Sequence, residues 1–311
     1  MPLYPGMDGA TVVQPAAAVD DRWVMSYAAG VGDTHPQYYE TDRRARVVAH
    51  PCFYWALSWP MLQKGLPSLF SKPVLPEEKG KAVHYGEDVI LHRAIRSGMS
   101  VTVSSKLVDA RARKKGTIVV SKHDMIDVHS GVLLLTHWTT SFYRGVELGA
   151  TVPVLKARQN ELPPPVPRSN AASSKTIVAW WTIPIAENEA HVYTECSRIW
   201  NPIHTNKRVA INAGLPGTVL HGTAFLAKAA SAIMKHYGPN SGDPSFVSRI
   251  SVGAFATNVF MPSTLTLRIF SVAKNMAGTV VHWDLITEQN QFAVRDGVVC
   301  FRPGHPQTSK I

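Results

Sequence analysis

The chain has 311 residues, of which 45% are apolar and only 17% are charged. This composition excludes a wholly disordered chain and is enough to bury one large core or two ordinary ones. The formal net charge is +10, but Lys and Arg form no dense block, so we expect a solvated basic face or a pocket rim for a phosphorylated ligand, and no nucleic-acid partner.

In chain order, the first predicted helix follows Pro51, a residue that suits the first turn of a helix. The segment after it is apolar and aromatic, and Pro60 is expected to end or kink the helix. Strands are expected to dominate beyond this helix, with hairpin turns at Lys115-Gly116 and Ser130-Gly131. The N-terminal part is therefore predicted to be one helix followed by an antiparallel sheet.

Residues 162-174 are rich in Pro, Ser and Asn, and they contain three consecutive prolines, which favour an extended, solvated linker. This linker divides the chain into a predicted N-terminal domain, residues 1-161, and a predicted C-terminal domain, residues 175-311. The two parts are similar in length, which is typical of an internal duplication.

The C-terminal part repeats the order of helix and strands. Its helix is predicted to begin near Gly222, because apolar residues then recur at helical spacing and several alanines make the helix slim enough for a sheet to wrap around it. Residues 264–269 alternate between polar and apolar, as in a half-buried strand. The dipeptide Asp296-Gly297 gives a stronger hairpin signal than those of the N-terminal part.

Four short segments match between the two parts at similar offsets, which indicates a tandem repeat. The matched pairs are Asp33–Tyr38 with Ile199–His204, Val48–Pro51 with Val219–Gly222, Gly116–Val119 with Gly278–Val281, and Gly131–Leu133 with Gly297–Val299. One central helix followed by antiparallel strands, twice over, predicts an α+β protein. Pairing the two sheets edge to edge would cover one exposed edge of each half.

The segment Ser197–His204, with the downstream sequence Leu220-His221-Gly222, resembles the MaoC-like R-specific enoyl-CoA hydratases. The motif of that family runs Asp-x-Asn-Pro-x-His, where the second x is Leu, Ile or Val, and a later His-Gly opens the central helix. The resemblance covers both halves and is fainter in the first. It implies a tandem (double) hot-dog fold, in which each half is an antiparallel sheet wrapped around a central helix.

The resemblance also implies a reaction. In that family an Asp and a His hold a water molecule that adds to an α,β-unsaturated thioester, while a backbone N–H at the start of the central helix binds the thioester oxygen. The expected activity is therefore that of a hydro-lyase on an α,β-unsaturated or 3-hydroxy acyl thioester, through an enolate-like intermediate. His204 is the expected general acid/base, and Gly222 is the expected oxyanion donor.

The sequence departs from the family motif in both halves. The position of the family's Asp is occupied by Ile199, which holds neither a proton nor a water molecule. In the first half Asp33 is present, but Tyr38 stands at the His position and Pro51, which has no N–H, at the Gly position. Two alternatives therefore stay open: a cyclase or isomerase that uses the same enolate chemistry, and a non-catalytic acyl-CoA-binding hot-dog protein.

Several other residues near the motifs are candidates for the site. Asn201 is included with the catalytic set, although its side chain is suited to holding the shape of the loop. Asp33, also in the catalytic set, is either a loop cap or the acid of a second pocket, with His35 as its partner. Glu195 replaces the missing Asp only if its strand turns it inward. The substrate-binding candidates are His221, Trp200, Tyr38 and His35. The alternative for His221 is a helix-start or packing residue. The aromatic residues near the motifs are alternatively core or pocket lining, namely Tyr38, Tyr39, Trp200 and Trp55.

The remaining expectations concern partners and location. The three cysteines, Cys52, Cys196 and Cys300, are odd in number and have no metal-ligand spacing, so we expect buried thiols in a reduced compartment and no metal. We expect no cofactor, no membrane segment and no signal peptide. The partner is a small acyl thioester, carried by CoA or a carrier protein, bound by a monomeric pseudo-dimer or a homo-oligomer. Ser309-Lys310-Ile311 resembles the peroxisomal Ser-Lys-Leu address, so the location is cytoplasmic or peroxisomal.

Overall fold

The computed structural model of the chain describes residues 11–42, 46–62, 82–147, 159–167 and 176–304. In chain order its elements are β1 (Val12–Val13), β2 (Ala17–Ala18), α1 (Asp21–Val31), η1 (Pro36–Tyr38), α2 (Tyr54–Leu62), β3 (Ala82–Leu91), β4 (Ser100–Arg113), β5 (Gly116–Asp127), β6 (Leu133–Arg144), η3 (Gln159–Glu161), β7 (Ala179–Ile185), α5 (Glu189–Ser197), η5 (Pro202–His204), α6 (Lys207–Asn212), α7 (Gly222–Tyr237), α8 (Pro239–Gly242), η6 (Pro244–Phe246), β8 (Val247–Phe255), β9 (Ser263–Asn275), β10 (Gly278–Ile286) and β11 (Phe292–Phe301).

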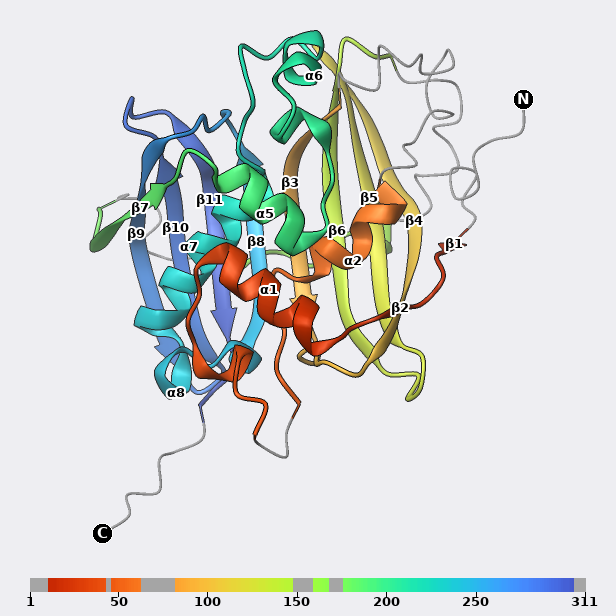
Figure 1. Cartoon of the computed structure of the whole chain (residues 1–311), viewed down its shortest axis with the longest axis vertical. Coiled ribbons are helices and arrows are strands. Elements are labelled where there is room, and N and C mark those ends of the chain that lie inside the picture. The colour runs from red at the N-terminus through yellow and green to blue at the C-terminus, as the bar shows by residue number, and fades with distance from the viewer. Residues whose placement is uncertain (1–10, 43–45, 63–81, 148–158, 168–175, 305–311) are drawn as a thin grey trace.

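The strands form one 11-stranded sheet with the order β1-β4-β5-β6-β3-β8-β11-β10-β9-β7, and β2 also pairs with β4. The two halves meet where β3 pairs antiparallel with β8, over Glu87↔Val252 to Ile90↔Arg249. Each half of the sheet curves around its own helix, α2 in the first half and α7 in the second (Figure 1). The predicted edge-to-edge pairing of two helix-wrapped sheets is confirmed.

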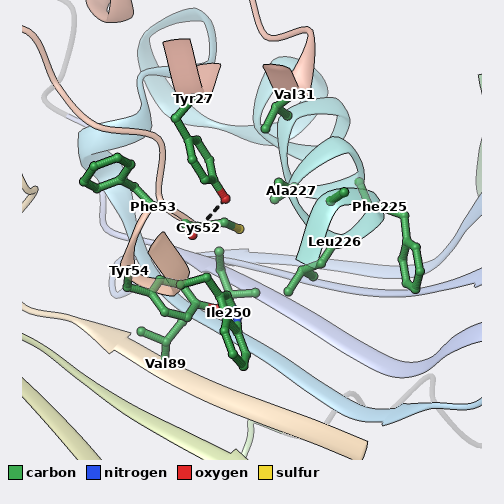
Figure 2. Packing of buried hydrophobic residues seen from close by; sticks show 14 of the residues in the cluster. Tyr27, Val31, Cys52, Phe53, Tyr54, Val89, Phe225, Leu226, Ala227 and Ile250 are labelled. Carbon is green, nitrogen blue, oxygen red and sulfur yellow. Dashed lines mark hydrogen bonds between the residues drawn. The ribbon is translucent and has the colours of Figure 1, made fainter. Parts of the chain in front are cut away.

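The two central helices differ in length, although both are buried. Helix α7 begins at Gly222, as predicted, and nine of its residues are buried, four of them alanines. Helix α2 has nine residues and contains Pro60 in its interior, so Pro60 does not end the helix, and the alternative that it kinks the helix stays a prediction. The helix continues to Leu62, because burial of its apolar residues outweighs the loss of one backbone hydrogen bond. Figure 2 shows side chains of both halves, such as Phe53 and Leu226, in the shared core.

One of the three predicted hairpins is wrong. Lys115 lies in the turn before β5, which begins at Gly116, and Ser130-Gly131 lies in the turn before β6, as expected. Asp296-Gly297 instead lies inside β11, where Asp296 has φ 53° and falls in the register shift of the pairing with β10, between Trp283↔Gly297 and Leu285↔Val294, so it forms a β-bulge. Gly297 is required there by the close packing of Trp283, because a Cβ would lie 2.3 Å from its ring.

The structure also corrects one of the repeat matches. Gly116 and Gly278 begin the corresponding strands β5 and β10, with φ values of 145° and 131°, so their match is a structural one. Gly131 lies in a turn, whereas Gly297 lies within a strand, and those two residues are therefore not equivalent. The repeat is real, but its strands have different lengths in the two halves.

The two halves also meet at helices α1 and α5, which lie side by side at the centre of Figure 1. The hydroxyl groups of Tyr27 and Tyr193 lie 3.1 Å apart there, and both side chains are fully buried. Tyr27 donates a hydrogen bond to the carbonyl of Cys52, as the dashed line in Figure 2 shows. Cys52 and Cys300 are buried as predicted, but Cys196 on α5 is only partly buried, so that expectation is wrong for one thiol.

Gly30 permits the close approach of α1 to α5, and we expect a larger residue there to destabilise the fold. A Cβ at Gly30 would lie 2.6 Å from the Cβ of Cys196. Gly30→Leu is expected to lower the free energy of unfolding by about 1–3 kcal/mol through overpacking, measured by urea denaturation. Ala29→Leu, at an exposed position of the same helix, is the control. Equal stability of the two variants would contradict the packing argument.

The described part of the predicted linker, residues 162–167, is bound to the sheet near the β3–β8 junction. The Arg249 guanidinium on β8 makes two hydrogen bonds to Asp88 on β3, at 2.6 and 2.9 Å, and also donates to the carbonyls of Pro164 and Pro165. Just before the linker, the Glu161 carbonyl accepts from the Trp138 indole at 2.7 Å. Residues 168–174 of the linker, and Ser309-Lys310-Ile311, lie outside the described residues.

Candidate functional site

The predicted Asn-Pro-Ile-His motif forms a short 3₁₀ turn, η5, directly after α5. Asn201 is its N-cap, and the side-chain oxygen of Asn201 accepts a hydrogen bond from the Ile203 N–H at 3.4 Å. Pro202 occupies the first position of the turn, where a missing N–H costs nothing. Asn201 therefore holds the shape of the loop, and the turn ends on His204, which it places against the start of α7.

The orientation of the His204 ring is fixed by one hydrogen bond. Nδ1 lies 2.7 Å from the carbonyl oxygen of Val219, which only accepts, so Nδ1 carries the proton. In the neutral ring Nε2 then keeps its lone pair and is suited to accept a proton. Burial lowers the pKa of His204 to about 4, although the Val219 carbonyl acts in the opposite direction. The imidazole is therefore held neutral at physiological pH.

His204 stacks on His221, the residue that precedes α7. The two ring centroids are 3.6 Å apart and the ring planes are 25° from parallel. Nε2 of His221 lies 3.3 Å from the Ile199 carbonyl and 3.4 Å from the Thr194 hydroxyl. Burial, and next the neighbouring His204, keep the pKa of His221 well below its ordinary value. His221 thus lies at the helix start and packs against His204, and a role in substrate binding stays a prediction.

Gly222 is the first residue of α7, and no side chain caps the N-terminus of this helix. His221 occupies the N-cap position but makes no side-chain capping hydrogen bond. The first N–H groups of a helix have no acceptor within the helix and attract negative charge. The Phe255 ring covers this point closely, because a Cβ at Gly222 would lie 3.3 Å from it.

The structure places three further residues near the motif, and one of them, Trp200, corrects an expectation. Ile199 is buried, with 3% of its surface exposed, and places an apolar side chain where the family has its Asp. Glu195 does not replace that Asp, because it lies on helix α5 rather than on a strand and is exposed to solvent. Trp200 is 55% exposed and is not a core residue. The next residue, Asn201, begins the turn that holds His204, and this turn leaves the Trp200 ring on the surface.

The first-half candidates form a separate group around Asp33. One carboxylate oxygen of Asp33 accepts from the backbone N–H of His35 at 3.0 Å, so Asp33 caps the loop. His35 does not partner Asp33 through its ring, because its Nδ1 accepts from the Gln37 N–H instead. Tyr38 is completely buried, as a core residue would be. Burial and the nearby Asp33 raise its pKa well above the ordinary value.

Sequence reasoning missed His50, a buried side chain that lies beside Asp33. Its Nε2 lies 3.8 Å from Asp33 and 3.0 Å from the hydroxyl of Ser231 on α7, while its Nδ1 accepts from the Cys52 N–H. Burial lowers the pKa of His50 to about 4, against the opposing effect of Asp33. The repeat match of Val48–Pro51 with Val219–Gly222 contained the signal, because it aligns His50 with His221.

A second group that sequence reasoning missed surrounds Glu87 on β3. Its carboxylate accepts hydrogen bonds from the Tyr54 hydroxyl at 2.8 Å and the Trp55 indole at 2.5 Å. Nε2 of His84 lies 3.5 Å from it, and Nε2 of His137 lies 3.8 Å from it. Burial raises the pKa of Glu87. Trp55, expected in the core or in a pocket lining, is therefore a buried hydrogen-bond donor.

Two hollows of about 390 and 520 Å³ lie side by side at the N-terminal end of α1, and they share Arg46, Ser97, Gly98, Met99 and His129. Neither is lined by His204 or Gly222. Arg43 and Arg44 lie outside the described residues. Among the described residues, no group of three His, Cys, Asp or Glu side chains is arranged to hold a metal ion. The described helices include none with the length and hydropathy of a membrane span.

Two family models match the chain, one in each half. Residues 170–288 match the MaoC like domain, and residues 8–135 match the FAS1-like, dehydratase domain region. The chain therefore carries a MaoC-like dehydratase domain and a FAS1-like dehydratase region, and the resemblance found in the sequence is confirmed.

Two relatives of known sequence cover most of this chain. Enoyl-CoA hydratase 2, peroxisomal, from Arabidopsis thaliana is 26% identical over 261 residues, which are 79% of this chain and 80% of that protein. Peroxisomal multifunctional enzyme type 2 from Drosophila melanogaster is 23% identical over 243 residues, which are 75% of this chain but only 38% of that enzyme. The chain thus spans well under half the length of the Drosophila relative.

Solved structures share the fold. A MaoC-like dehydratase from Phytophthora capsici has a TM-score of 0.75 and 18% identity, and the match covers 100% of both chains. A conserved hypothetical protein from Mycobacterium tuberculosis, described as having a double hotdog fold, has a TM-score of 0.58 and 12% identity, with 96% of each chain covered. Together with the sheet order, these matches confirm the predicted tandem hot-dog fold.

Proposed function

We propose that this chain, which joins a FAS1-like dehydratase region to a MaoC-like domain, is a hydro-lyase that adds water to, or removes it from, an acyl thioester. The observation that carries this proposal is the stacking of the His204 ring on His221, the residue that directly precedes α7. It brings a neutral imidazole, with a free Nε2, next to a helix N-terminus. The names of the two relatives, an enoyl-CoA hydratase and a peroxisomal multifunctional enzyme, support the same class of substrate.

In this mechanism the chain supplies one proton carrier and one anion site. The thioester oxygen of an enoyl substrate lies at the Gly222 N–H, where the helix dipole and a fixed donor stabilise the negative charge that develops as the enolate forms. His204 accepts the proton of the attacking water at Nε2, and the resulting imidazolium returns a proton to the α-carbon. The reverse sequence removes water from a 3-hydroxyacyl thioester.

The test is the loss of absorbance of the conjugated thioester when the full chain is mixed with crotonyl-CoA and longer trans-2-enoyl-CoA substrates. Turnover above the rate without protein, with a 3-hydroxyacyl-CoA as product, is expected. No turnover of any enoyl length, with every substrate still bound, would refute the hydro-lyase proposal.

A second candidate function is binding of acyl thioesters without turnover, and one observation favours it. The Asp position of the motif is a buried isoleucine, and its exposed neighbour Glu195 does not take its place. A cyclase or isomerase that draws its nucleophile from the substrate itself fits the same observation. Binding with no chemical change of any enoyl substrate, including hydroxylated ones, would favour the non-catalytic protein.

The low pKa of His204 predicts an unusual pH profile. Because burial lowers this pKa from 6.5 to about 4, the neutral, proton-accepting ring persists well below neutrality. The acidic limb of kcat/KM is therefore expected to have its midpoint near pH 4 rather than near pH 6.5. The measurement is the initial rate from pH 3.5 to 8, with each sample returned to pH 7 to check that the protein stays folded. A midpoint between pH 6 and 7 would exclude a buried His204 as the proton acceptor.

The proposal also covers the location of the protein, the carrier of the acyl group and the functional unit. The Arabidopsis and Drosophila relatives are named as peroxisomal, and this supports a peroxisomal location for the present chain. The substrate is proposed to be a small acyl thioester carried by CoA, as the name of the Arabidopsis relative suggests. The chain already pairs two hot-dog halves through β3 and β8, so a monomer is the proposed functional unit.

A further inference from the structure

The inner face of the N-terminal sheet contains a row of polar residues at positions where a core is expected. Ser105 on β4 is paired with His123 on β5, and His123 is paired with His137 on β6. The Ser105 hydroxyl lies 2.7 Å from Nδ1 of His123. All three side chains are buried, and His137 is completely so. We refer to Ser105, His123 and His137 as the polar row.

The C-terminal half fills the corresponding positions with aliphatic residues. The repeat aligns Thr117, paired with Tyr143, with Thr279, paired with Phe301. The same spacing along β5 and β10 then aligns His123 with Leu285. Leu285 is paired with Leu267 on one side and Val294 on the other, and all three are completely buried. One half of the duplicated fold thus has Leu, Leu and Val where the other has Ser, His and His.

The polar row is costly to the fold, because part of its hydrogen-bonding capacity is unused. Nε2 of His123 and Nδ1 of His137 are buried and have no hydrogen-bond partner. A buried polar atom without a partner destabilises the fold, and the aliphatic row of the other half shows that the fold does not need such atoms at these positions. Two imidazole nitrogens therefore remain available, in the interior, to a group that the chain itself does not supply.

The polar row is connected to the start of α7 by a short series of contacts. The rings of His123 and His137 are 5.4 Å apart, and His137 lies beside Glu87. Glu87 lies beside His84, whose side chain is 23% exposed and whose ring is 4.3 Å from that of Phe255. Phe255 is the residue that covers Gly222. The proposed thioester site and the polar row thus lie at the two ends of one continuous series of side-chain contacts.

We propose that the polar row, with Glu87, binds a hydroxyl group on the distal part of the acyl chain, so that the site selects hydroxylated acyl thioesters. This inference rests on the proposed function, because it assumes that the thioester end lies at Gly222. A hydroxyl group both donates and accepts, so it can donate to the Glu87 carboxylate or an imidazole lone pair and accept from an imidazole N–H. A saturated chain end offers neither and would leave the unpaired nitrogens desolvated.

The experiment measures binding of saturated thioesters, which do not react, by isothermal titration of the full chain. The probes are decanoyl-CoA and 10-hydroxydecanoyl-CoA, with the corresponding pairs of eight and twelve carbons to vary the reach. For at least one length, the hydroxylated probe is expected to bind about tenfold more tightly, the effect of one well-formed buried hydrogen bond. Equal or weaker binding of the hydroxylated probe at all three lengths would overturn the proposal.

The control variants come from the repeat itself. His123→Leu/His137→Val places the residues of the C-terminal half into the N-terminal half, and is expected to abolish or reverse the preference for the hydroxylated probe. His92→Leu, an exposed histidine of the same half, is expected to leave the preference unchanged. A preference that survives the double substitution would assign it to other residues and refute the role of the polar row. If the double variant does not fold, the ratio of the dissociation constants of the two probes, measured with the wild-type chain, still decides whether the proposal holds.

Failure of this proposal and failure of the proposed function have different signatures. Crotonyl-CoA has only four acyl carbons, too few to span the side chains between Gly222 and the polar row, so its hydration does not depend on the polar row. Turnover of crotonyl-CoA without a hydroxyl preference would leave the hydro-lyase intact and remove the polar-row proposal. A preference for the hydroxylated probe in binding, without turnover of any enoyl substrate, would support the polar-row proposal and refute the hydro-lyase proposal.

Discussion

Replacing His204 with alanine is expected to lower kcat/KM for trans-2-enoyl-CoA substrates by about 10²–10⁴-fold, the usual contribution of a positioned general acid/base. His204 is the only proton carrier in the proposed mechanism, because Ile199 occupies the position of the family's Asp and Glu195 points to solvent. Affinity for a saturated acyl-CoA should change much less, because Gly222 and the rest of the site are untouched. The measurement is the rate of absorbance loss over a range of substrate concentrations.

A second substitution separates proton transfer from loop positioning. In His204→Asn the side-chain amide can still donate to the Val219 carbonyl, as Nδ1 does now, but nothing replaces Nε2. This variant is expected to fold like the wild type and to be as inactive as His204→Ala. His35→Ala, in the equivalent loop of the first half, should stay within about twofold of wild type. Near-normal turnover by His204→Asn would assign His204 a structural role only.

The second large effect concerns the buried ion pair at the junction of the halves. Asp88→Ala is expected to lower the free energy of unfolding by about 3–5 kcal/mol, because it leaves a buried guanidinium without its counter-charge. Arg249 is only 8% exposed, and its remaining partners are the neutral carbonyls of Pro164 and Pro165. The measurement is denaturant unfolding of the full chain.

Two comparisons make this stability prediction specific. The double variant Asp88→Leu/Arg249→Met removes both charges and is expected to regain much of the lost stability. Arg268 and Asp284 form a pair of the same geometry in the C-terminal half, but the Arg268 side chain is 22% exposed. Asp284→Ala should therefore cost less than Asp88→Ala. If Asp88→Ala and Asp284→Ala lower the free energy of unfolding by the same amount, burial of the ion pair does not determine the loss of stability.

Local sequence patterns predicted the elements that depend on neighbours along the chain. The start of α7 followed from the apolar spacing after Gly222, and the duplicated order of helix and strands followed from the repeat. Asp296-Gly297 misled because a dipeptide signals only φ, and positive φ serves a bulge as well as a hairpin. The contact that decides between them, Trp283 against Gly297, joins two strands and is not visible in either segment alone.

In the candidate site, too, the features that depend on neighbours along the chain were predicted and those that depend on distant residues were not. The spacing of Asn201, His204 and Gly222 predicted a turn beside a helix start, and the structure has this geometry. The contact between Asp33 and His50, and the cluster around Glu87, depend on which strands and loops come together. Their residues are scattered in sequence, and their polar character in a core becomes visible only when the register of the sheet is known.

The hydrogen-bonded seam between β3 and β8 has an evolutionary consequence. Two separate copies of a homodimeric protein must change together, because each substitution appears on both sides of the twofold axis. Fusion of the copies into one polypeptide removes that constraint, and the shared sheet still ties their stabilities together. Each half is thereby free to change alone, and the two halves lack different parts of the family motif: the second has Ile199 at the Asp position, and the first has Tyr38 and Pro51 at the His and Gly positions.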